Sequence, residues 1–316
     1  MTDNKLAIVS GCAGFIGSHV SEALLNEGYF VMGIDNFITG SPTNIDLLKT
    51  DKNFQFMQHD LIKPLPKRIT SLKPRIIIHL ASPASPPDYQ KFWLETMLVN
   101  SIGTLGLLEL ARKHNARFVF SSTSEVYGDP IAHPQPESYW GNVNSYGPRA
   151  MYDESKRFAE ALIWNYRRVH RVNTGIVRIF NTYGPRMRPQ DGRVVINFLT
   201  QAIQGKPLTI HGDGTQTRAF CYVDDMVAGI LKMAKSNIEG PINLGNPREF
   251  TINELCQKIE QVVGKKLAKK HLARPENDPE KRRPDITIAK KLLGWQPRVD
   301  LEEGLRQTLE WLKITR

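Results

Sequence analysis

The stretch from Lys5 to Asp35 constrains the fold more than any other part of the chain. Residues 5–10 read KLAIVS, a short apolar strand, and the glycine-rich run GCAGFIG follows at once. Apolar residues then recur at helical spacing, so the segment predicts a strand, a glycine turn and a helix. The next apolar run, YFVMGID, ends in Asp35, about 20 residues beyond the glycines.

This pattern indicates a dinucleotide site. Gly11, Gly14 and Gly17 let the backbone turn tightly, approach a pyrophosphate and pack helix on strand. Asp35 suits a ribose, and Asn36 rather than arginine after it favours NAD over NADP; a structural turn with an exposed aspartate is the alternative. We expect the NAD site to comprise Gly11, Gly14, Phe15, Ile16, Gly17, Asp35, Asn36, Thr39, Gly40, Asp60, Leu61, Leu80, Ala81, Ser82, Val99, Tyr152 and Lys156.

Further apolar runs alternate with helical patterns. FQFMQHD, RIIIHLA and RFVFSS read as strands, and Leu98, Ile102 and Leu105 mark a long helix. This alternation predicts an α/β fold with a Rossmann-like, doubly wound parallel sheet and ligands at the carboxyl ends of its strands. We expect an NAD-binding domain over 1–180, with about 219–246 packing back on it, and a smaller α/β substrate-binding domain over 181–316.

The stretch from Ser121 to Lys156 contains the side chains that an acid/base site needs. Thr123, Ser124 and Glu125 end a predicted strand, and Tyr152 and Lys156 lie four apart on the first turn of a predicted helix. A cation beside the phenol favours the phenolate, so Tyr152 is a candidate base. An amphipathic surface helix would show the same bare spacing, and hydroxyls at a strand end can be capping groups.

Arginines gather after residue 180, where turn residues also become frequent. Four of them suit a pyrophosphate or carboxylate, although any one could be an ordinary surface residue: Arg186, Arg188, Arg193 and Arg218. In the same half, Thr251 and Glu254 form a capping box for a helix that ends at Gly264. A final amphipathic helix is predicted over 301–312.

Composition narrows the function classes. The chain has 316 residues, 41% of them hydrophobic, and a net charge of +10. No basic helix or aromatic-basic platform accompanies that charge, so we favour a polyanionic small molecule over a nucleic acid. The three scattered cysteines argue against disulfides or zinc. No signal peptide and no membrane-spanning run are apparent, so we expect a cytoplasmic protein. From the cysteine spacing we expect no metal site.

The ordered motifs resemble a known family. GCAGFIGS, IDNFITG, HLASPAS, SSTSEVYGDP, YDESKR, RIFNTYGPRM, DGRVVINF, GTQTRAFCYVDD, NLGNP and KRRPD follow one another as in the extended short-chain dehydrogenase/reductase superfamily. Within it, the combination of ASPASPP, STSEVYGDP and KRRPD resembles the UDP-glucuronic acid decarboxylases, also called UDP-xylose synthases. The likeness runs from about residue 5 to residue 312.

The resemblance implies an NAD-dependent enzyme that converts UDP-glucuronate to UDP-xylose and carbon dioxide. Tyr152, supported by Lys156 and Thr123, would remove the C4 hydroxyl proton while hydride passes to the cofactor. Ser124 and Glu125 would act at decarboxylation and C5 protonation. Arg282 would contact the carboxylate or stabilise developing charge, and the nucleotide sugar would be held by Asn181, Arg186, Arg193, Arg218 and Arg282. The superfamily also suggests a homodimer through helices around 88–112 and 152–169.

Rival functions stay open at this point. A nucleotide-sugar 4-epimerase shares Tyr152, Lys156 and NAD but has no need of Glu125 with Arg282. A 4,6-dehydratase uses a Thr-Asp-Glu run, and here Ser124 replaces the aspartate. A non-catalytic NAD-sensing module would not need the intact tyrosine and lysine pair.

Overall fold

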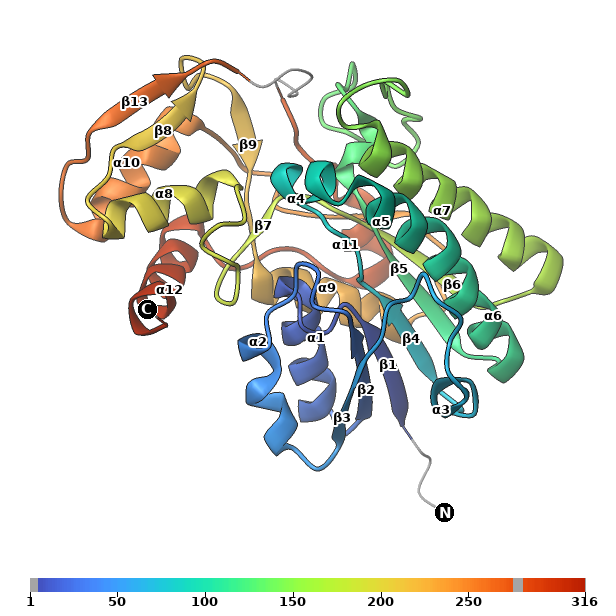
Figure 1. The fold of residues 1–316 in the computed structure, drawn as a ribbon. Helices are drawn as coiled ribbons and strands as arrows, with labels where there is room; N and C mark the ends of the chain where they lie inside the picture. The colour runs from blue at the N-terminus through green and yellow to red at the C-terminus, as the bar shows by residue number, and fades with distance from the viewer. Residues whose placement is uncertain (1–4, 275–280, 316) are drawn as a thin grey trace.

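A seven-stranded parallel sheet forms the centre of the protein. We describe a computed structural model, which covers residues 5–274 and 281–315 (Figure 1). The strand order is β11-β6-β5-β4-β1-β2-β3. The strands are β1 (Leu6–Ser10), β2 (Phe30–Asp35), β3 (Phe54–Gln58), β4 (Ile76–His79), β5 (Arg117–Thr123), β6 (Thr174–Ile179) and β11 (Ile242–Leu244). The predicted doubly wound parallel sheet is confirmed.

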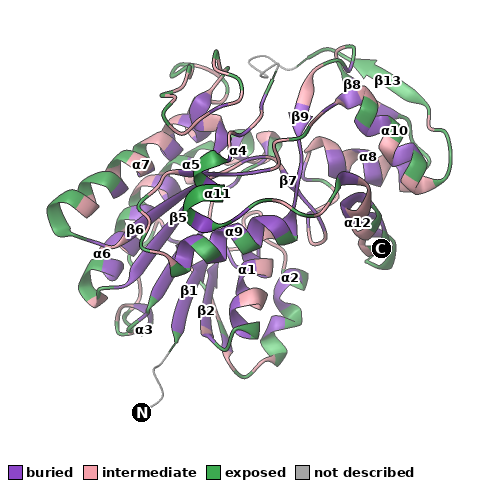
Figure 2. Cartoon of the chain, turned by 180° about the vertical axis from the view of Figure 1, so that it is seen from behind, coloured by how far each residue is buried: buried purple, intermediate pink, exposed green. Residues whose placement is uncertain are grey.

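Helices cover both faces of this sheet. One face carries α1 (Phe15–Asn26), α9 (Val223–Lys235) and α11 (Thr287–Leu293). The other carries α5 (Trp93–Leu98), α6 (Thr104–His114) and α7 (Ala150–His170). Shorter helices are α2 (Thr43–Asp46), α3 (Lys67–Thr70) and α4 (Pro86–Lys91), with 3-10 turns at Leu48–Thr50 and Ser124–Tyr127. Because both faces are covered, β1, β4 and β5 are buried along their whole length (Figure 2).

The predicted long helix around Leu98 is three pieces. A π-helical turn at Val99–Gly103 separates α5 from α6. Ile102 and Leu105, which marked the predicted helix, are both exposed. The run Trp93–His114 is also the one described helix that is long and apolar enough to cross a membrane, and half of it is buried inside the protein. The expectation that no apolar run could span a membrane is therefore wrong by length and composition. The buried core helix of a folded domain meets the same two criteria.

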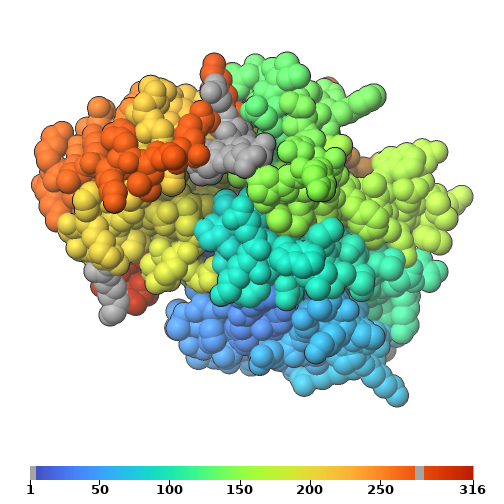
Figure 3. Space-filling view, turned by 45° about the horizontal axis from the view of Figure 1, so that its top comes forward, coloured from blue at the N-terminus to red at the C-terminus, as the bar shows by residue number. Residues whose placement is uncertain are grey.

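The second half of the chain builds a smaller lobe beside the sheet lobe. It contains α8 (Val194–Ile203), α10 (Ile252–Val263) and α12 (Leu301–Ile314), together with three two-stranded sheets. These sheets pair β7 (Thr182–Tyr183) with β10 (Cys221–Tyr222), β9 (Thr217–Ala219) with β12 (Glu249–Thr251), and β8 (Leu208–His211) with β13 (Lys269–Leu272). Figure 3 shows the yellow and orange segments of this lobe beside the blue, teal and green segments of the other.

The chain passes between the lobes more than once. After β10 it returns to the sheet lobe as α9 and β11, and β11 pairs with β6, with Ile242 opposite Val177. It then leaves again into β12 and α10, whose start has the predicted capping box of Thr251 and Glu254 and whose end is at Gly264 in a left-handed conformation. The two lobes therefore share interleaved segments.

Candidate active site

A cavity of about 530 Å³ lies where the two lobes meet. Its walls come from the glycine turn, the carboxyl end of β5, the start of α7 and the arginine-rich segment after β6. Every residue predicted to be catalytic or to hold substrate lines it: Thr123, Ser124, Glu125, Tyr152, Lys156, Asn181, Arg186, Arg193, Arg218 and Arg282. Segments far apart in the sequence are thus brought to one place.

The glycine turn offers a close backbone approach to a ligand. Gly11 has a φ of +74°, and a Cβ on Gly17 would lie 1.9 Å from the Gly11 carbonyl oxygen. Gly14 caps the start of α1, so the free N–H groups of that helix point into the cavity mouth. This cradle fits the pyrophosphate of a dinucleotide.

A second, smaller cavity of about 60 Å³ adjoins the first at Gly11, Gly14 and Leu80. The Asp35 carboxylate lies in its wall and accepts hydrogen bonds from the backbone N–H groups of Ala13 (3.0 Å) and Phe37 (2.7 Å). Burial raises the pKa of Asp35, and these N–H groups oppose the shift. The other predicted cofactor residues line one or both cavities: Phe15, Ile16, Gly17, Asn36, Thr39, Gly40, Asp60, Leu61, Ala81, Ser82 and Val99.

Tyr152 and Lys156 leave the first turns of α7 on the same face. The Lys156 Nζ lies 5.8 Å from the centroid of the Tyr152 ring and donates a 2.7 Å hydrogen bond to the Ser121 carbonyl. Burial lowers the pKa of Lys156 to about 7. Burial also raises the pKa of Tyr152 above its ordinary value, with a hydrogen bond to Thr123 opposing the rise. Removal of the phenol from water therefore outweighs the neighbouring cation that we expected to lower the Tyr152 pKa.

The end of β5 places the other polar groups. Thr123 caps the following 3-10 turn by accepting a 3.2 Å hydrogen bond from the Glu125 N–H. Its hydroxyl therefore has both the capping role that we weighed and contact with Tyr152. Ser124 is buried in the cavity wall.

Glu125 is held between two guanidinium groups. Its Oε2 accepts from Arg149 Nη2 at 2.5 Å and from Arg282 Nη2 at 3.1 Å, while Oε1 accepts from Arg282 Nη1. Burial alone would raise the pKa of Glu125, but Arg282 and Arg149 outweigh it and hold that pKa well below its usual range. Glu125 is therefore an ionised carboxylate in a largely buried cluster.

Asp153 adds a second carboxyl to this neighbourhood. It is buried, and among the described residues its Oδ1 has no hydrogen-bond partner. Burial raises the pKa of Asp153 to about 7, and the nearby Glu125 charge acts in the same direction. Asp153 does not line the cavity, so its link to the site is this electrostatic coupling to Glu125.

The arginines of the second lobe are not equivalent. Arg193 is paired with Asp191 at 2.6 Å, and Arg188 is paired with Asp88. Arg186, predicted to hold substrate, turns towards α1 and pairs with Glu22 at 2.7 Å, so it lies on the glycine-turn side of the cavity. Arg218 lines the same cavity from β9. The cavity thus has cationic groups along its length.

The described residues do not form a cluster of metal ligands. Within residues 5–274 and 281–315, no three His, Cys, Asp or Glu side chains are grouped to hold a metal ion. Cys12, Cys221 and Cys256 are free and buried.

Comparisons with known proteins agree with this geometry. The family model described as GDP-mannose 4,6 dehydratase matches residues 8–308. UDP-glucuronic acid decarboxylase 1 of Danio rerio is 48% identical over 309 residues, which cover 98% of this chain and 73% of that protein. UDP-glucuronic acid decarboxylase 5 of Arabidopsis thaliana is 48% identical over 303 residues, covering 96% and 87%.

The chain belongs to the UDP-glucuronic acid decarboxylase family. The family resemblance drawn from the motifs is thereby confirmed. Among solved structures, the UDP-glucuronic acid 4-epimerase from Bacillus cereus in complex with UDP-glucuronic acid and NAD is 32% identical, with a TM-score of 0.88 over 98% of this chain and 100% of that one.

Two residues of this decarboxylase-family chain enter the site without having been predicted. Arg149 contacts Glu125, and Tyr89 stacks on Tyr152 with ring centroids 5.0 Å apart and planes within 9°. The Tyr89 hydroxyl is buried without a hydrogen-bond partner among the described residues, and the residue lines the cavity. The position of Arg149 one turn before Tyr152 was a usable signal for it, whereas a lone tyrosine after ASPASPPD gave none.

Proposed function

We propose that the protein is an NAD-dependent UDP-glucuronate decarboxylase, which releases UDP-xylose and carbon dioxide through a 4-keto intermediate. One observation carries the proposal: the cluster of Glu125, Arg282 and Arg149 shares a cavity with the Tyr152 and Lys156 pair. The two named decarboxylases, about half identical to this chain over nearly its full length, support the same activity.

The described residues fit NAD. The Gly11–Gly17 turn and the start of α1 would hold the pyrophosphate, and Asp35 would hold a ribose. The Bacillus cereus epimerase binds NAD on the same fold. When bound, NAD supplies the oxidant that takes hydride from C4 of the sugar and later returns it.

Tyr152 accepts the C4 hydroxyl proton in the first half of the reaction. Tyr152 must therefore be deprotonated before it reacts, whereas burial favours its protonated form. Thr123, by its hydrogen bond, and Arg193, by its charge, lower the pKa of Tyr152 and act in the required direction. Lys156, with its pKa near 7, can give up or take a proton close to neutrality.

The cation cluster acts in the second half. The 4-ketone lies β to the C6 carboxylate, so cleavage of the C5–C6 bond leaves its electron pair delocalised as an enolate. Arg282 and Arg149 are placed to stabilise that negative charge, and C5 then takes a proton from the Ser124 hydroxyl, which water re-protonates. Glu125, held ionised, fixes both guanidinium groups beside the reacting carbon.

Epimerisation at C4 is the second candidate because the Bacillus cereus neighbour is an epimerase for the same sugar nucleotide. An epimerase must keep C6, whereas a cationic cluster beside the reacting carbon promotes its loss. Incubation with UDP-glucuronate and NAD, followed by product identification, separates the two. UDP-xylose with carbon dioxide supports the proposal, and UDP-galacturonate contradicts it.

We also propose a cytoplasmic homodimer. Support for the dimer is a set of exposed apolar side chains on the adjacent helices α5 and α7: Trp93, Leu94, Met97, Phe158 and Trp164. Support for the compartment is the presence of three free, buried cysteines. Fractionation of the source cells would test the location, since recovery of the protein with membranes or outside the cell would contradict it.

A further inference from the structure

The chain around Arg282 is anchored to a distant loop. Gln135, fully buried in the insert before α7, donates its backbone N–H to the Arg283 carbonyl at 2.9 Å. Its side-chain Oε1 accepts the Arg283 N–H at 2.8 Å, and its carbonyl accepts the Asp285 N–H at 2.9 Å. The backbone that follows Arg282 is therefore fixed by three hydrogen bonds to one residue.

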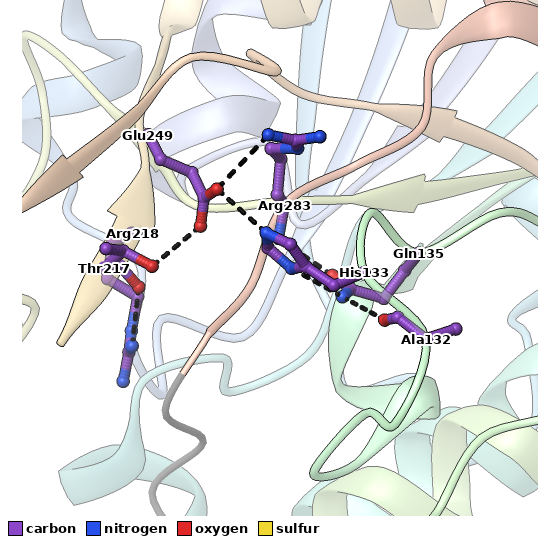
Figure 4. Close-up of polar contacts among 7 residues, drawn as sticks. All are labelled: Ala132, His133, Gln135, Thr217, Arg218, Glu249 and Arg283. Carbon is purple, nitrogen blue, oxygen red and sulfur yellow. Dashed lines mark hydrogen bonds and ion pairs between the residues drawn. The ribbon is translucent and has the colours of Figure 1, made fainter.

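The Glu249 carboxylate contacts both this loop and the second lobe. Its Oε2 accepts from His133 Nε2 at 2.9 Å and from Arg283 Nη1 at 3.5 Å, while Oε1 accepts from Thr217 Oγ1 at 2.7 Å (Figure 4). In Figure 4 the Glu249 side chain lies between His133 and Arg283 on one side and Thr217 on the other. Three segments that are distant in sequence thus meet at Glu249.

The Thr217 contact leads to the substrate end of the cavity. Thr217 precedes Arg218 on β9, and Arg218 Nη1 donates to the Thr217 carbonyl at 2.8 Å. β9 also pairs with β12, which places Phe250 opposite Arg218 and Glu249 opposite Ala219. Arg218 lines the cavity, but Glu249, His133 and Arg283 do not, so Glu249 can act only through its neighbours.

We infer that Glu249 is a positioning residue that ties Arg282 to the strand carrying Arg218. The inference rests on the proposed decarboxylation. Arg218 would hold the nucleotide diphosphate, and Arg282 would stabilise the negative charge that decarboxylation leaves. Through Glu249, the seating of the nucleotide and the placement of Arg282 on Glu125 depend on each other.

Glu249→Gln tests this link with little change of shape. The glutamine oxygen can still accept from Thr217, but its NH₂ group faces His133 and Arg283, both donors. We expect the steady-state rate of UDP-xylose formation to fall about 10- to 100-fold, because Arg282 is displaced from Glu125. The KM for UDP-glucuronate should change less, by about twofold. In a single turnover, the absorbance of the reduced nicotinamide should rise before product forms, since only the second half-reaction is slowed.

A double-mutant cycle separates positioning from a general loss of stability. If Glu249 acts through Arg283, then Glu249→Gln with Arg283→Ala should slow product formation no more than the slower single variant. Additive losses would overturn the inference. His133→Gln, at a partly exposed position, gives a milder variant if Glu249→Gln fails to fold, and normal rates for both His133→Gln and Arg283→Ala would also overturn it.

Controls distinguish this inference from the proposed function. Glu254→Gln removes a carboxylate that is bonded to Thr251 at the start of α10, and it should leave the order of the two signals unchanged. If the unaltered protein forms no UDP-xylose, the proposed function fails. If it forms UDP-xylose and Glu249→Gln matches it in rate and in signal order, only the inference about Glu249 fails.

Discussion

At the scale of single residues, burial decides the chemistry of the site. The charged forms of Tyr152 and Lys156 have opposite signs, yet burial favours the neutral form of both. The spacing of the two residues placed them on one helix face, but their pKa shifts depend on segments that pack over them from elsewhere. Glu125 resists the same trend only because Arg149 and Arg282 reach it from distant segments.

Tyr152→Phe should abolish turnover and preserve cofactor binding. The ring still stacks on Tyr89, but the proton acceptor is lost, so we expect a fall of about 10²-fold or more in kcat. Calorimetric titration with NAD and a product assay measure the two properties. Tyr166→Phe, on the same helix but bonded to Glu109, is the matched control. Turnover near normal in Tyr152→Phe would contradict its role as base.

Glu125→Ala should separate the two half-reactions. Oxidation at C4 depends on Tyr152 and should persist in part, while Arg282 and Arg149 lose the carboxylate that orients them. We expect some reduced nicotinamide with UDP-glucuronate and little UDP-xylose, measured by absorbance and chromatography. The melting temperature checks that the two unpaired buried cations have not unfolded the protein. Equal loss of both half-reactions would count against the assignment.

Asp153→Asn should stabilise the protein increasingly as pH rises. The folded-state pKa of Asp153 is raised to about 7, so the unfolded chain loses this proton first. The stability that the bound proton provides is therefore lost between about pH 4 and about pH 7, and asparagine avoids that loss. The difference in melting temperature between Asp153→Asn and the unaltered protein should widen over this range. Glu154→Gln, an exposed neighbour, should show no such widening.

At the scale of elements, the sequence predicted where a helix begins and ends better than whether a helix is continuous. The capping box at Thr251 and the glycine end at Gly264 were both predicted, because each depends on side chains within one turn. The break between α5 and α6 was not, since a π-helical turn leaves the apolar spacing almost unchanged. Tyr89 was missed for a related reason, because its stacking on Tyr152 joins segments that are far apart in the sequence.

Thr251→Ala should lower the stability of the second lobe. The threonine hydroxyl accepts the Glu254 N–H at 3.0 Å, and loss of such a cap costs about 1 kcal/mol. We expect a fall of about 2 °C in the melting temperature, measured by calorimetry. Thr287→Ala is the control, because α11 has no side-chain cap. Equal effects of the two substitutions would mean that the capping bond contributes nothing.

At the scale of the whole molecule, the alternation of strands and helices was enough to predict the sheet. It was not enough to predict how the second lobe is assembled from short strand pairs, since strands of two or three residues have no readable periodicity. The position of the cavity followed from the sheet, because ligands bind at the carboxyl ends of parallel strands.

The proposed dimer has a direct test at this scale. Phe158→Glu and Met97→Glu each place a charge in the exposed apolar surface of α7 and α5. We expect either substitution to shift the protein from dimer to monomer, measured by light scattering during gel filtration. Leu292→Glu, an equally exposed apolar position on α11, should leave the mass unchanged. A monomeric unaltered protein would contradict the dimer.

Because the chain returns to the sheet through α9 and β11, a single cut does not separate the two lobes. A fragment ending near residue 180 would leave β6 as a bare edge and strip α9 from the apolar face of α1. We therefore expect such a fragment to aggregate on expression. Fusion partners and tags belong at the termini, not at the boundary between the lobes.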